Sequence, residues 1–210
     1  MQVSGRQSAR KKTVSDVLLQ VGDRARERLH PCFTAAGVSY PPRSVTLLAV
    51  KTSAQLEVWV NEAHVKSLIR TYPIMALSGG PGPKLAEGDR QVPEGVYRIA
   101  ALNPNSRFHL SMKLNYPNAF DLEQAAREGR EFPGTDIFIH GRAQSVGCLA
   151  MGDTAIEELF VLVADTVYQQ VDVVIAPDDP RCSGLQSIEA LPWTDELYRT
   201  IESAFARYKK

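Results

Sequence analysis

A histidine and a cysteine lie eight positions apart near the middle of the chain, in the run His140-Gly141-Arg142-Ala143-Gln144-Ser145-Val146-Gly147-Cys148. The apolar tetrad 137–140 reads as a short strand that ends at His140, and Gly141 then breaks the strand. A thiol attacks a carbonyl once a base has taken its proton, and histidine is the usual base. Gly147 lets the backbone beside Cys148 approach a substrate closely. This spacing predicts Cys/His acyl-transfer chemistry.

Each residue of this run has an expected role. Cys148 is the expected nucleophile, and His140 is expected to take the thiol proton and later protonate the leaving amine. The amides of Gly147 and Cys148 are the expected oxyanion donors, at about 3 kcal/mol each. A backbone carbonyl, with Gly141 as a candidate, would orient the imidazole, and Ser145 would either bond that ring or close the turn. The structural alternatives are a buried cysteine and a strand-end histidine.

Composition excludes several classes of function. The chain has 210 residues, 44% of them hydrophobic, with 24 basic and 24 acidic side chains and four histidines. Zero net charge gives no overall field for nucleic acid, and four histidines make a multi-histidine metal cage improbable. No apolar run approaches the roughly 20 residues needed to span a bilayer. The first residues lack an apolar signal region, which fits a cytoplasmic protein or a trimmed mature form.

Three cysteines leave the redox state open. Cys32 and Cys182 could pair in an oxidising compartment and leave Cys148 free. Three reduced thiols, two of them buried as small hydrophobic residues, explain the count equally well.

Hydrophobic periodicity predicts the elements that must position the His/Cys run. Helical spacing predicts a helix over 14–29 that Pro31 ends and a C-terminal helix after Thr194, and residues 121–131 are expected to form a short polar helix or a loop. A capping box formed by Thr154 and Glu157 predicts the start of another helix. Alternation predicts strands at 45–50, 56–60, 96–101, 108–114, 137–140 and 171–175. Short strands joined by tight turns are typical of an antiparallel sheet.

Further motifs follow one another in a fixed order. They are Ser78-Gly79, Gly82-Pro83-Lys84, Gly88-Asp89, Pro93-Glu94-Gly95, Asn103-Pro104, Tyr116-Pro117-Asn118, His140-Gly141 and Ser145-Val146-Gly147-Cys148. As an ordered set over about residues 44–176, this succession resembles the L,D-transpeptidase catalytic-domain (YkuD-like) family, and within it the YafK-like branch.

The resemblance implies an α+β fold, with a mainly antiparallel, β-sandwich-like catalytic domain and flanking N- and C-terminal helices. It divides the chain into an N-terminal helical extension (1–43), an L,D-transpeptidase-like catalytic domain (44–180) and a C-terminal helical extension packed on that domain (181–210). It also implies a protein of the periplasm or cell envelope that acts on peptidoglycan stem peptides and uses no metal or organic cofactor.

The resemblance further implies a reaction. Family cysteines attack the carbonyl at meso-diaminopimelate and form a thioester. Transpeptidases pass the acyl group to an amine, whereas some YafK-like members pass it to water and release a lipoprotein lysine linked to peptidoglycan. We therefore expect hydrolysis of that bond. Cross-linking or lipoprotein attachment is one alternative, and a non-catalytic peptidoglycan-binding module is another.

One position departs from the family pattern. The widespread motif carries a histidine two positions before the cysteine, where this chain has Val146. His140 matches the other family histidine, so the role of base passes to it. The departure favours the divergent hydrolytic branch, and it is also the best support for a binding module. A cytoplasmic cysteine hydrolase with an unrelated substrate rests only on the missing signal region.

A substrate that carries carboxylates requires cationic recognition. The expected substrate-binding residues are Arg142, Lys84, His109 and Tyr116. Arg142 follows the histidine closely, and Lys84 follows a loop rich in glycine and proline. His109 is expected to share a strand face with Ser111 and Lys113, next to Tyr116. Each also has an ordinary explanation as an exposed turn, loop or sheet residue.

Overall fold

The sheet that carries the His/Cys run combines strands from nearly the whole chain. The computed structural model describes residues 10–62 and 65–209. The strands are β1 Val45–Val50, β2 Gln55–Glu62, β3 Val65–Pro73, β4 Gly95–Asn103, β5 Ser111–Leu114, β6 Phe138–His140, β7 Leu149–Ala150 and β8 Val171–Ala176. The helices are α1 Val14–Ala35, α2 Ala119–Arg127, α3 Asp153–Thr166 and α4 Thr194–Phe205, with a 3-10 turn at Tyr168–Gln170.

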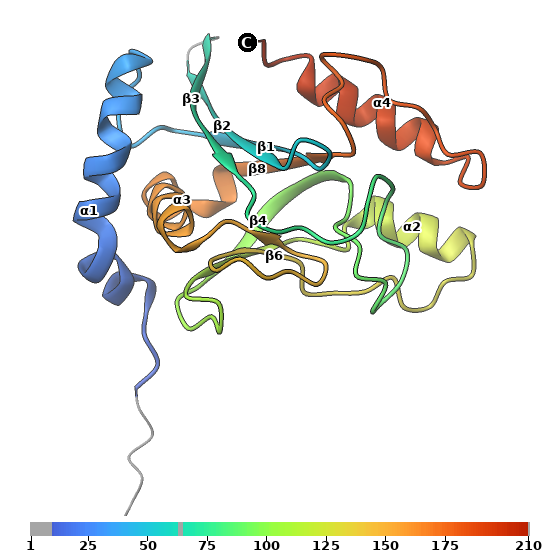
Figure 1. The fold of residues 1–210 in the computed structure, drawn as a ribbon, viewed down its shortest axis with the longest axis horizontal. Helices are drawn as coiled ribbons and strands as arrows, with labels where there is room; N and C mark the ends of the chain where they lie inside the picture. Colours follow the sequence, from blue (N-terminus) through green and yellow to red (C-terminus); the bar gives the residue numbers. More distant parts are fainter. Residues whose placement is uncertain (1–9, 63–64, 210) are drawn as a thin grey trace, which may run out of the picture.

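The strands follow the order β3-β2-β1-β8-β4-β5-β6-β7. The β1–β8 and β6–β7 pairs are parallel, and the other neighbouring pairs are antiparallel. The sheet curls, so that β1, β2, β3 and β8 lie above β4 and β6 in Figure 1. The predicted class, α+β and mainly antiparallel with flanking helices, is confirmed.

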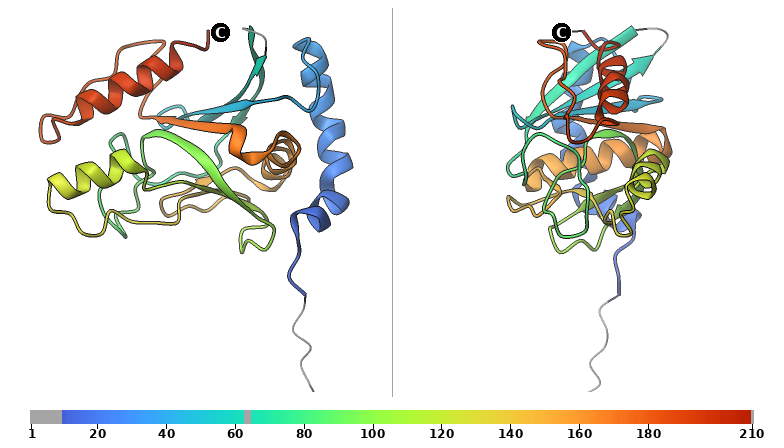
Figure 2. Two further views of the ribbon diagram at one scale, coloured as in Figure 1. Left: turned by 180° about the vertical axis from the view of Figure 1, so that it is seen from behind. Right: turned by 90° about the vertical axis from the view of Figure 1, so that its right-hand side faces the viewer.

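Helix α3 fills the concave side of the curled sheet (Figure 1). It is apolar on nearly all sides, and its residues from Leu159 to Val163 are fully buried. A helix that is hydrophobic all round belongs inside a core. Helix α1 covers α3 from outside, where Arg26 forms an ion pair with Asp165 at 2.8 Å (Figure 2).

Helix α4 packs on the opposite face of the sheet (Figure 2). Its buried Leu197, Ile201 and Phe205 form a second apolar cluster with residues of β1, β2 and β8, among them Trp59. The N- and C-terminal helices therefore attach to different faces of the sheet. The boundaries predicted at residues 43 and 180 remain predictions.

Three local predictions were wrong. Helix α1 continues through Pro31 to Ala35, because burial of Leu29 and Phe33 on one face outweighs the loss of one backbone hydrogen bond. Helix α3 begins at Asp153 after Gly152, with no side-chain cap, so Thr154 forms no capping box. The strand expected over 108–114 begins only at Ser111.

Candidate active site

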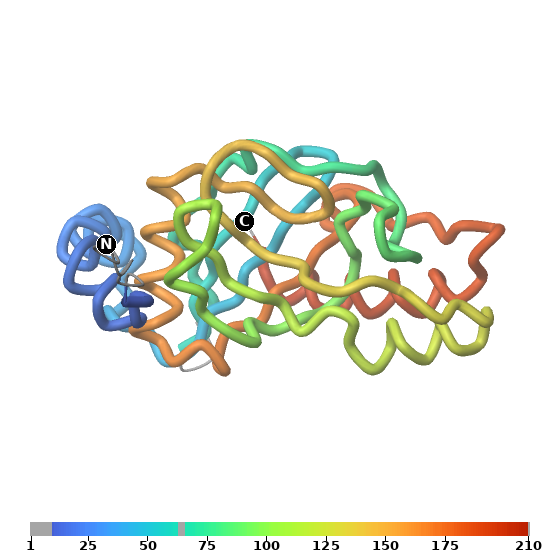
Figure 3. The backbone as a smooth tube through the Cα atoms, turned by 90° about the horizontal axis from the view of Figure 1, so that it is seen from below, coloured from blue at the N-terminus to red at the C-terminus, as the bar shows by residue number. Residues whose placement is uncertain are grey.

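The two faces of the β5–β6–β7 portion of the sheet differ sharply. Met112, Ile139 and Leu149 point into the apolar core and are at most 1% exposed. Side chains alternate between faces along a strand, so His140 and Ser111 lie on the other face. The register pairs these two residues directly. Seen from below (Figure 3), the gold segment around residues 130–150 runs along this side of the molecule.

The register also relates His140 to Cys148. In the parallel β6–β7 pair, His140 lies opposite Ala150. Cys148 lies one residue before β7, and the alternation of β7 continued by that residue puts its side chain on the same face as the imidazole, one strand across and two residues along. Strand spacing and rise put the two Cα atoms about 8 Å apart. Strand geometry therefore directs both side chains towards one surface, although no hydrogen bond joins them in this structure.

His140 is held by its own loop and by an aromatic ring. Its Nδ1 lies 2.6 Å from the carbonyl oxygen of Gly141, and its ring stacks on Phe108 with centroids 4.5 Å apart. A carbonyl only accepts, so Nδ1 carries the proton and Nε2 keeps its lone pair in the neutral ring. Burial lowers the pKa of His140 below its usual 6.5, although the bond to Gly141 opposes the shift. The imidazole is therefore a neutral acceptor at neutral pH.

Only glycine fits at position 141, directly after His140. A Cβ added there would lie 2.6 Å from the Phe108 carbonyl oxygen and 2.8 Å from a carboxylate oxygen of Asp153. These close approaches bring the Phe108 loop and the start of α3 against the histidine. The sequence signal for this role was the glycine that directly follows His140.

Cys148 is partly exposed, and its thiol is protonated at rest. Burial raises the pKa of the Cys148 thiol above its ordinary value; the backbone of Phe138 and the positive charge of Lys84 oppose the rise, and Asp136 adds to it. The Sγ atom makes one long contact, 3.9 Å, to the carbonyl oxygen of Asp136. A neutral thiol near a neutral imidazole requires a base during attack, rather than a preformed thiolate.

The turn before the thiol is closed by Ser145. Its hydroxyl accepts from the Cys148 amide at 3.0 Å and donates to the Cys148 carbonyl at 2.5 Å. Of the two roles left open for Ser145, the structure shows the turn-closing one. The Gly147 amide donates to Ser78 Oγ at 2.5 Å. Both amides expected to face an oxyanion are therefore bonded to serine oxygens.

Ser78 enters the site from an edge that the sequence did not predict. An antiparallel bridge pairs Ala76 with Ala150, and the Ala150 amide donates to the Ala76 carbonyl at 2.9 Å. Continued by two residues, this register places Ser78 beside Cys148, in accord with the contact between Ser78 and Gly147. Ser78 opens one of the recognised motifs, but nothing in the sequence pairs it with the thiol.

The glycine- and proline-rich loop after Ser78 is anchored from beneath. The Lys51 ammonium donates to Glu94 at 2.9 Å and to the carbonyls of Gly82 and Val92. The other carboxylate oxygen of Glu94 accepts from Tyr198 of α4 at 2.9 Å. Side chains of both Lys51 and Glu94 are at most 2% exposed. This cluster fixes the loop between β1 and α4.

The two expected cationic residues lie in different surroundings. The Arg142 side chain is exposed and forms no ion pair with any residue in the described part of the chain. Its backbone has a positive φ of 60°, and its amide donates to Asp153 at 2.8 Å. Lys84 is nearly buried, and its ammonium bonds Asp89 at 2.5 Å and the Ala86 carbonyl at 2.8 Å. Its charge still acts on the thiol, because it opposes the rise in the pKa of Cys148.

His109 and Tyr116 are also paired within the protein. His109 has a positive φ of 72° ahead of β5, and its Nε2 lies 3.0 Å from a carboxylate oxygen of Glu157 in α3. The alternation predicted that His109 shares a strand face with Ser111, and this prediction was wrong, because His109 lies outside β5. Tyr116 is buried at 4% exposure, and its hydroxyl donates to the Pro133 carbonyl at 2.7 Å.

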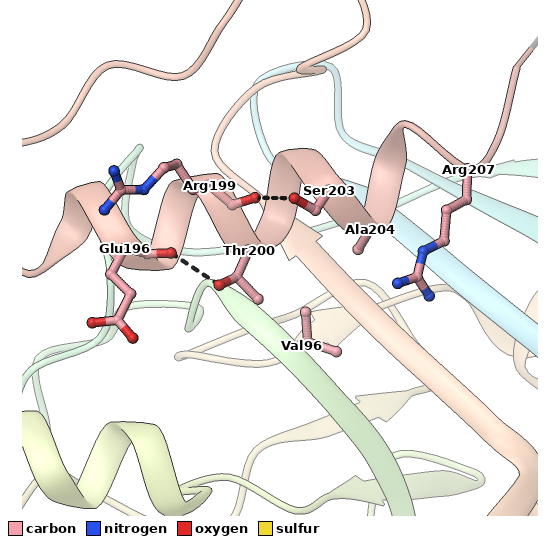
Figure 4. Close-up of a pocket in the computed structure, with 7 residues that line it drawn as sticks. All are labelled: Val96, Glu196, Arg199, Thr200, Ser203, Ala204 and Arg207. Atoms are coloured by element: carbon pink, nitrogen blue, oxygen red, sulfur yellow. Dashed lines mark hydrogen bonds between the residues drawn. The ribbon is translucent and has the colours of Figure 1, made fainter.

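A surface hollow lies away from these residues. The hollow between α4 and β4 in Figure 4 is lined by Val96, Glu196, Arg199, Thr200, Ser203, Ala204 and Arg207. Its hydroxyls bond carbonyls of their own helix, Thr200 to Glu196 at 2.9 Å and Ser203 to Arg199 at 2.8 Å. All three cysteines are free, so the Cys32–Cys182 disulfide is not formed. Among residues 10–62 and 65–209, no helix is both long and apolar enough to cross a bilayer.

Comparisons with known proteins agree on one family. Residues 45–175 match the family model described as "L,D-transpeptidase catalytic domain". The chain is 33% identical over 129 residues to the Escherichia coli (strain K12) protein named "Putative L,D-transpeptidase YafK", covering 60% of this chain and 50% of that protein. The Escherichia coli O157:H7 protein of the same name matches equally. The chain thus spans about half the length of these relatives.

The similarity to solved structures concerns the fold. The helical cell shape determining protein Pgp2 from Campylobacter jejuni, as its K307A mutant, has a TM-score of 0.55 at 20% identity, covering 92% of this chain and 61% of that one. Another Pgp2 structure gives a TM-score of 0.54 at 18% identity, covering 81% and 72%.

Proposed function

Because this chain belongs to the L,D-transpeptidase catalytic-domain family, we propose that it performs cysteine-dependent acyl transfer on peptidoglycan stem peptides in the cell envelope. One observation carries the proposal. Continued one residue before β7, the β6–β7 register puts the thiol of Cys148 on the face of the sheet that carries the imidazole of His140. The ring is a neutral base, and the thiol is reachable from solvent.

The reaction begins when substrate binds over this face. Nε2 of His140 takes the thiol proton while Sγ of Cys148 attacks the carbonyl at meso-diaminopimelate. The carbonyl electron pair moves to oxygen, and the resulting tetrahedral intermediate collapses to a thioester as the leaving amine takes the proton from His140. Water then attacks the thioester with the same imidazole as base, which regenerates the thiol.

The bond cleaved is the one between peptidoglycan and a linked lipoprotein lysine. Val146 supports this choice over cross-linking, because the resemblance to the YafK-like branch, some members of which pass the acyl group to water, implies a non-histidine at this position. Arg142, whose exposed guanidinium is unpaired among the described residues, is the proposed partner of a substrate carboxylate. Lys84, His109 and Tyr116 are weaker candidates for substrate contacts, because each already bonds a protein group.

Digestion of sacculi tests the proposal. Wild-type protein and a Cys148→Ala variant are incubated with lipoprotein-linked and with plain sacculi, and the products are resolved by mass. Release of the linked lysine peptide by the wild type alone supports hydrolysis. New stem-peptide dimers would instead establish transpeptidation. No thiol-dependent product from either substrate would overturn both.

A non-catalytic peptidoglycan-binding module is the second candidate. Its support is that the Cys148 thiol contacts the Asp136 carbonyl, and no hydrogen bond joins it to His140. Iodoacetamide labelling separates the two functions. In a competent site His140 takes the thiol proton, so Cys148 is alkylated faster in the wild type than in His140→Gln; in a binding module the two proteins label Cys148 at the same rate.

A further inference from the structure

Ser78 carries a hydroxyl that contacts the turn before the nucleophile and whose proton is not already used. Its Oγ accepts from the Gly147 amide at 2.5 Å, and no residue in the described part of the chain accepts a hydrogen bond from it. Ser145, the other serine next to the thiol, donates to the Cys148 carbonyl. Ser78 is therefore a donor with a fixed oxygen and a free proton.

The need for such a donor arises from the turn itself. Developing charge on a carbonyl oxygen requires donors that are fixed in advance. The amides of Gly147 and Cys148 would be the obvious pair, but each is bonded to a serine oxygen at 2.5 Å and 3.0 Å respectively. An oxyanion that used them would have to displace Ser78 or Ser145.

Register places the Ser78 hydroxyl on the right face. Ser78 lies opposite Cys148 when the Ala76–Ala150 bridge is continued, and directly opposed side chains share a face. His140 lies on that face, in the strand on the far side of β7, which Cys148 directly precedes. The thiol is thus flanked by an acceptor on one side and a hydroxyl donor on the other.

The loop that carries Ser78 is rigid. Gln91 donates to the carbonyls of Gly80 and Gly82 and accepts from the Gly80 amide at 3.1 Å. Gly79 has a φ of +80°, and a Cβ added there would overlap the Gln91 side chain. The loop therefore holds the serine in place before substrate arrives.

We propose that Ser78 is a catalytic residue, whose hydroxyl donates a hydrogen bond to the oxyanion formed when Cys148 attacks an acyl carbon. The inference rests on the proposed acyl transfer. In the attack, Sγ bonds to carbon, its proton passes to His140, and the carbonyl electron pair becomes the oxyanion that Ser78 stabilises. The serine keeps its own proton throughout and forms no covalent bond.

Two probes of Cys148 separate this role from a structural one. Acylation by p-nitrophenyl acetate passes through an oxyanion, whereas alkylation by iodoacetamide does not. Ser78→Ala should slow acylation of Cys148 about 100- to 1,000-fold, as for removal of one oxyanion donor, and leave alkylation within about twofold. Ser78→Thr, which keeps the hydroxyl, should recover most of the acylation rate. Peptide mass mapping distinguishes Cys148 from Cys32 and Cys182.

Several outcomes would overturn the inference. One is an equal loss of acylation and alkylation in Ser78→Ala, which indicates that the serine only positions the Gly147 turn. Another is an acylation rate in Ser78→Thr as low as that in Ser78→Ala, which would mean that the hydroxyl is not the group that matters. A third is a wild-type Cys148 that iodoacetamide alkylates but p-nitrophenyl acetate does not acylate, because no oxyanion would then form for Ser78 to stabilise. Wild-type acylation without release of any sacculus product would defeat the proposed function but leave Ser78 testable.

Discussion

The buried Lys51–Glu94 pair and the buried His140 differ in how many of their polar atoms have hydrogen-bond partners. Beneath the glycine-rich loop, the Lys51 ammonium has three acceptors, and the Glu94 carboxylate accepts from Lys51, Gly82 and Tyr198. At the face of β6 and β7, Nε2 of His140 forms no hydrogen bond to a described residue. The ring as a whole is buried, but Nε2 itself is reached by solvent, so it stays available as an acceptor.

The difference separates structural from chemical roles. Lys51 and Glu94 are ordinary catalytic residue types, yet each has its partners and fixes a loop between two elements. His140 is equally buried at 2% exposure, but it keeps one nitrogen for an incoming proton. Residue type therefore identified candidates, and the remaining bonding capacity distinguishes them. The predictions below act on one group and leave the other unchanged.

The largest effect is expected at the nucleophile. Cys148→Ala should abolish thiol-dependent product release, a loss of at least about 1,000-fold, because a methyl group cannot form a thioester. The free energy of unfolding should change by about 1 kcal/mol or less, since the lost atom is partly exposed and has one long contact. Product release by mass and denaturant unfolding check both parts. Activity retained in this variant would remove Cys148 from the mechanism.

The next effect is expected at the base. In His140→Gln, the amide can still donate to the Gly141 carbonyl, but it cannot accept a proton from the thiol. Turnover should fall about 100- to 10,000-fold, as for loss of a general base. His30→Gln, at an exposed position on α1, is the matched control and should leave turnover unchanged. An equal effect of both changes would mean that His140 supports the fold alone.

Removing the buried cation should act on stability instead. Lys51→Met leaves the Glu94 carboxylate buried without its ammonium, and should lower the free energy of unfolding by about 3–5 kcal/mol. Lys113→Met is the matched control, because Lys113 and Asp136 are both exposed, and should lower it by about 1 kcal/mol or less. Thermal and denaturant unfolding compare the two. Equal losses would contradict the distinction drawn between buried and exposed pairs.

The sequence predicted the parts of the site that lie close together along the chain. The apolar run before His140 predicted strand β6, and the alternation from residue 108 placed Ser111 and Lys113 on one face. Local signals can do this because strand periodicity is a property of neighbouring residues. The Gly141 carbonyl that orients the imidazole was also within reach of that reasoning.

The remainder depends on contacts between distant segments. Ser78 lies beside the turn before Cys148 because residue 76 pairs with residue 150. A second pairing between distant segments is that of β1 with β8, which are parallel. Alternation within one strand cannot predict either pairing. The same is true of His109, which leaves the expected strand face because Glu157 of α3 lies beside it. Helix α1 also depends on distant contacts: it continues past Pro31 because its face beyond the proline is buried against the rest of the protein.

The smallest expected effect concerns pH. Burial lowers the pKa of His140 below 6.5, so on acidification the imidazole loses its free lone pair only below pH 6.5. The acid limb of kcat/KM for sacculus hydrolysis should therefore have its midpoint below 6.5, with more than half of the plateau value retained at that pH. Phe108→Ala removes the ring that covers the imidazole. The imidazole is then better hydrated, so its pKa, and with it the midpoint, should move up towards 6.5. Leu122→Ala, at an exposed residue of α2, should leave the midpoint unchanged. A wild-type midpoint above 6.5 would instead indicate a thiolate–imidazolium pair, because a neighbouring negative charge raises the pKa of histidine.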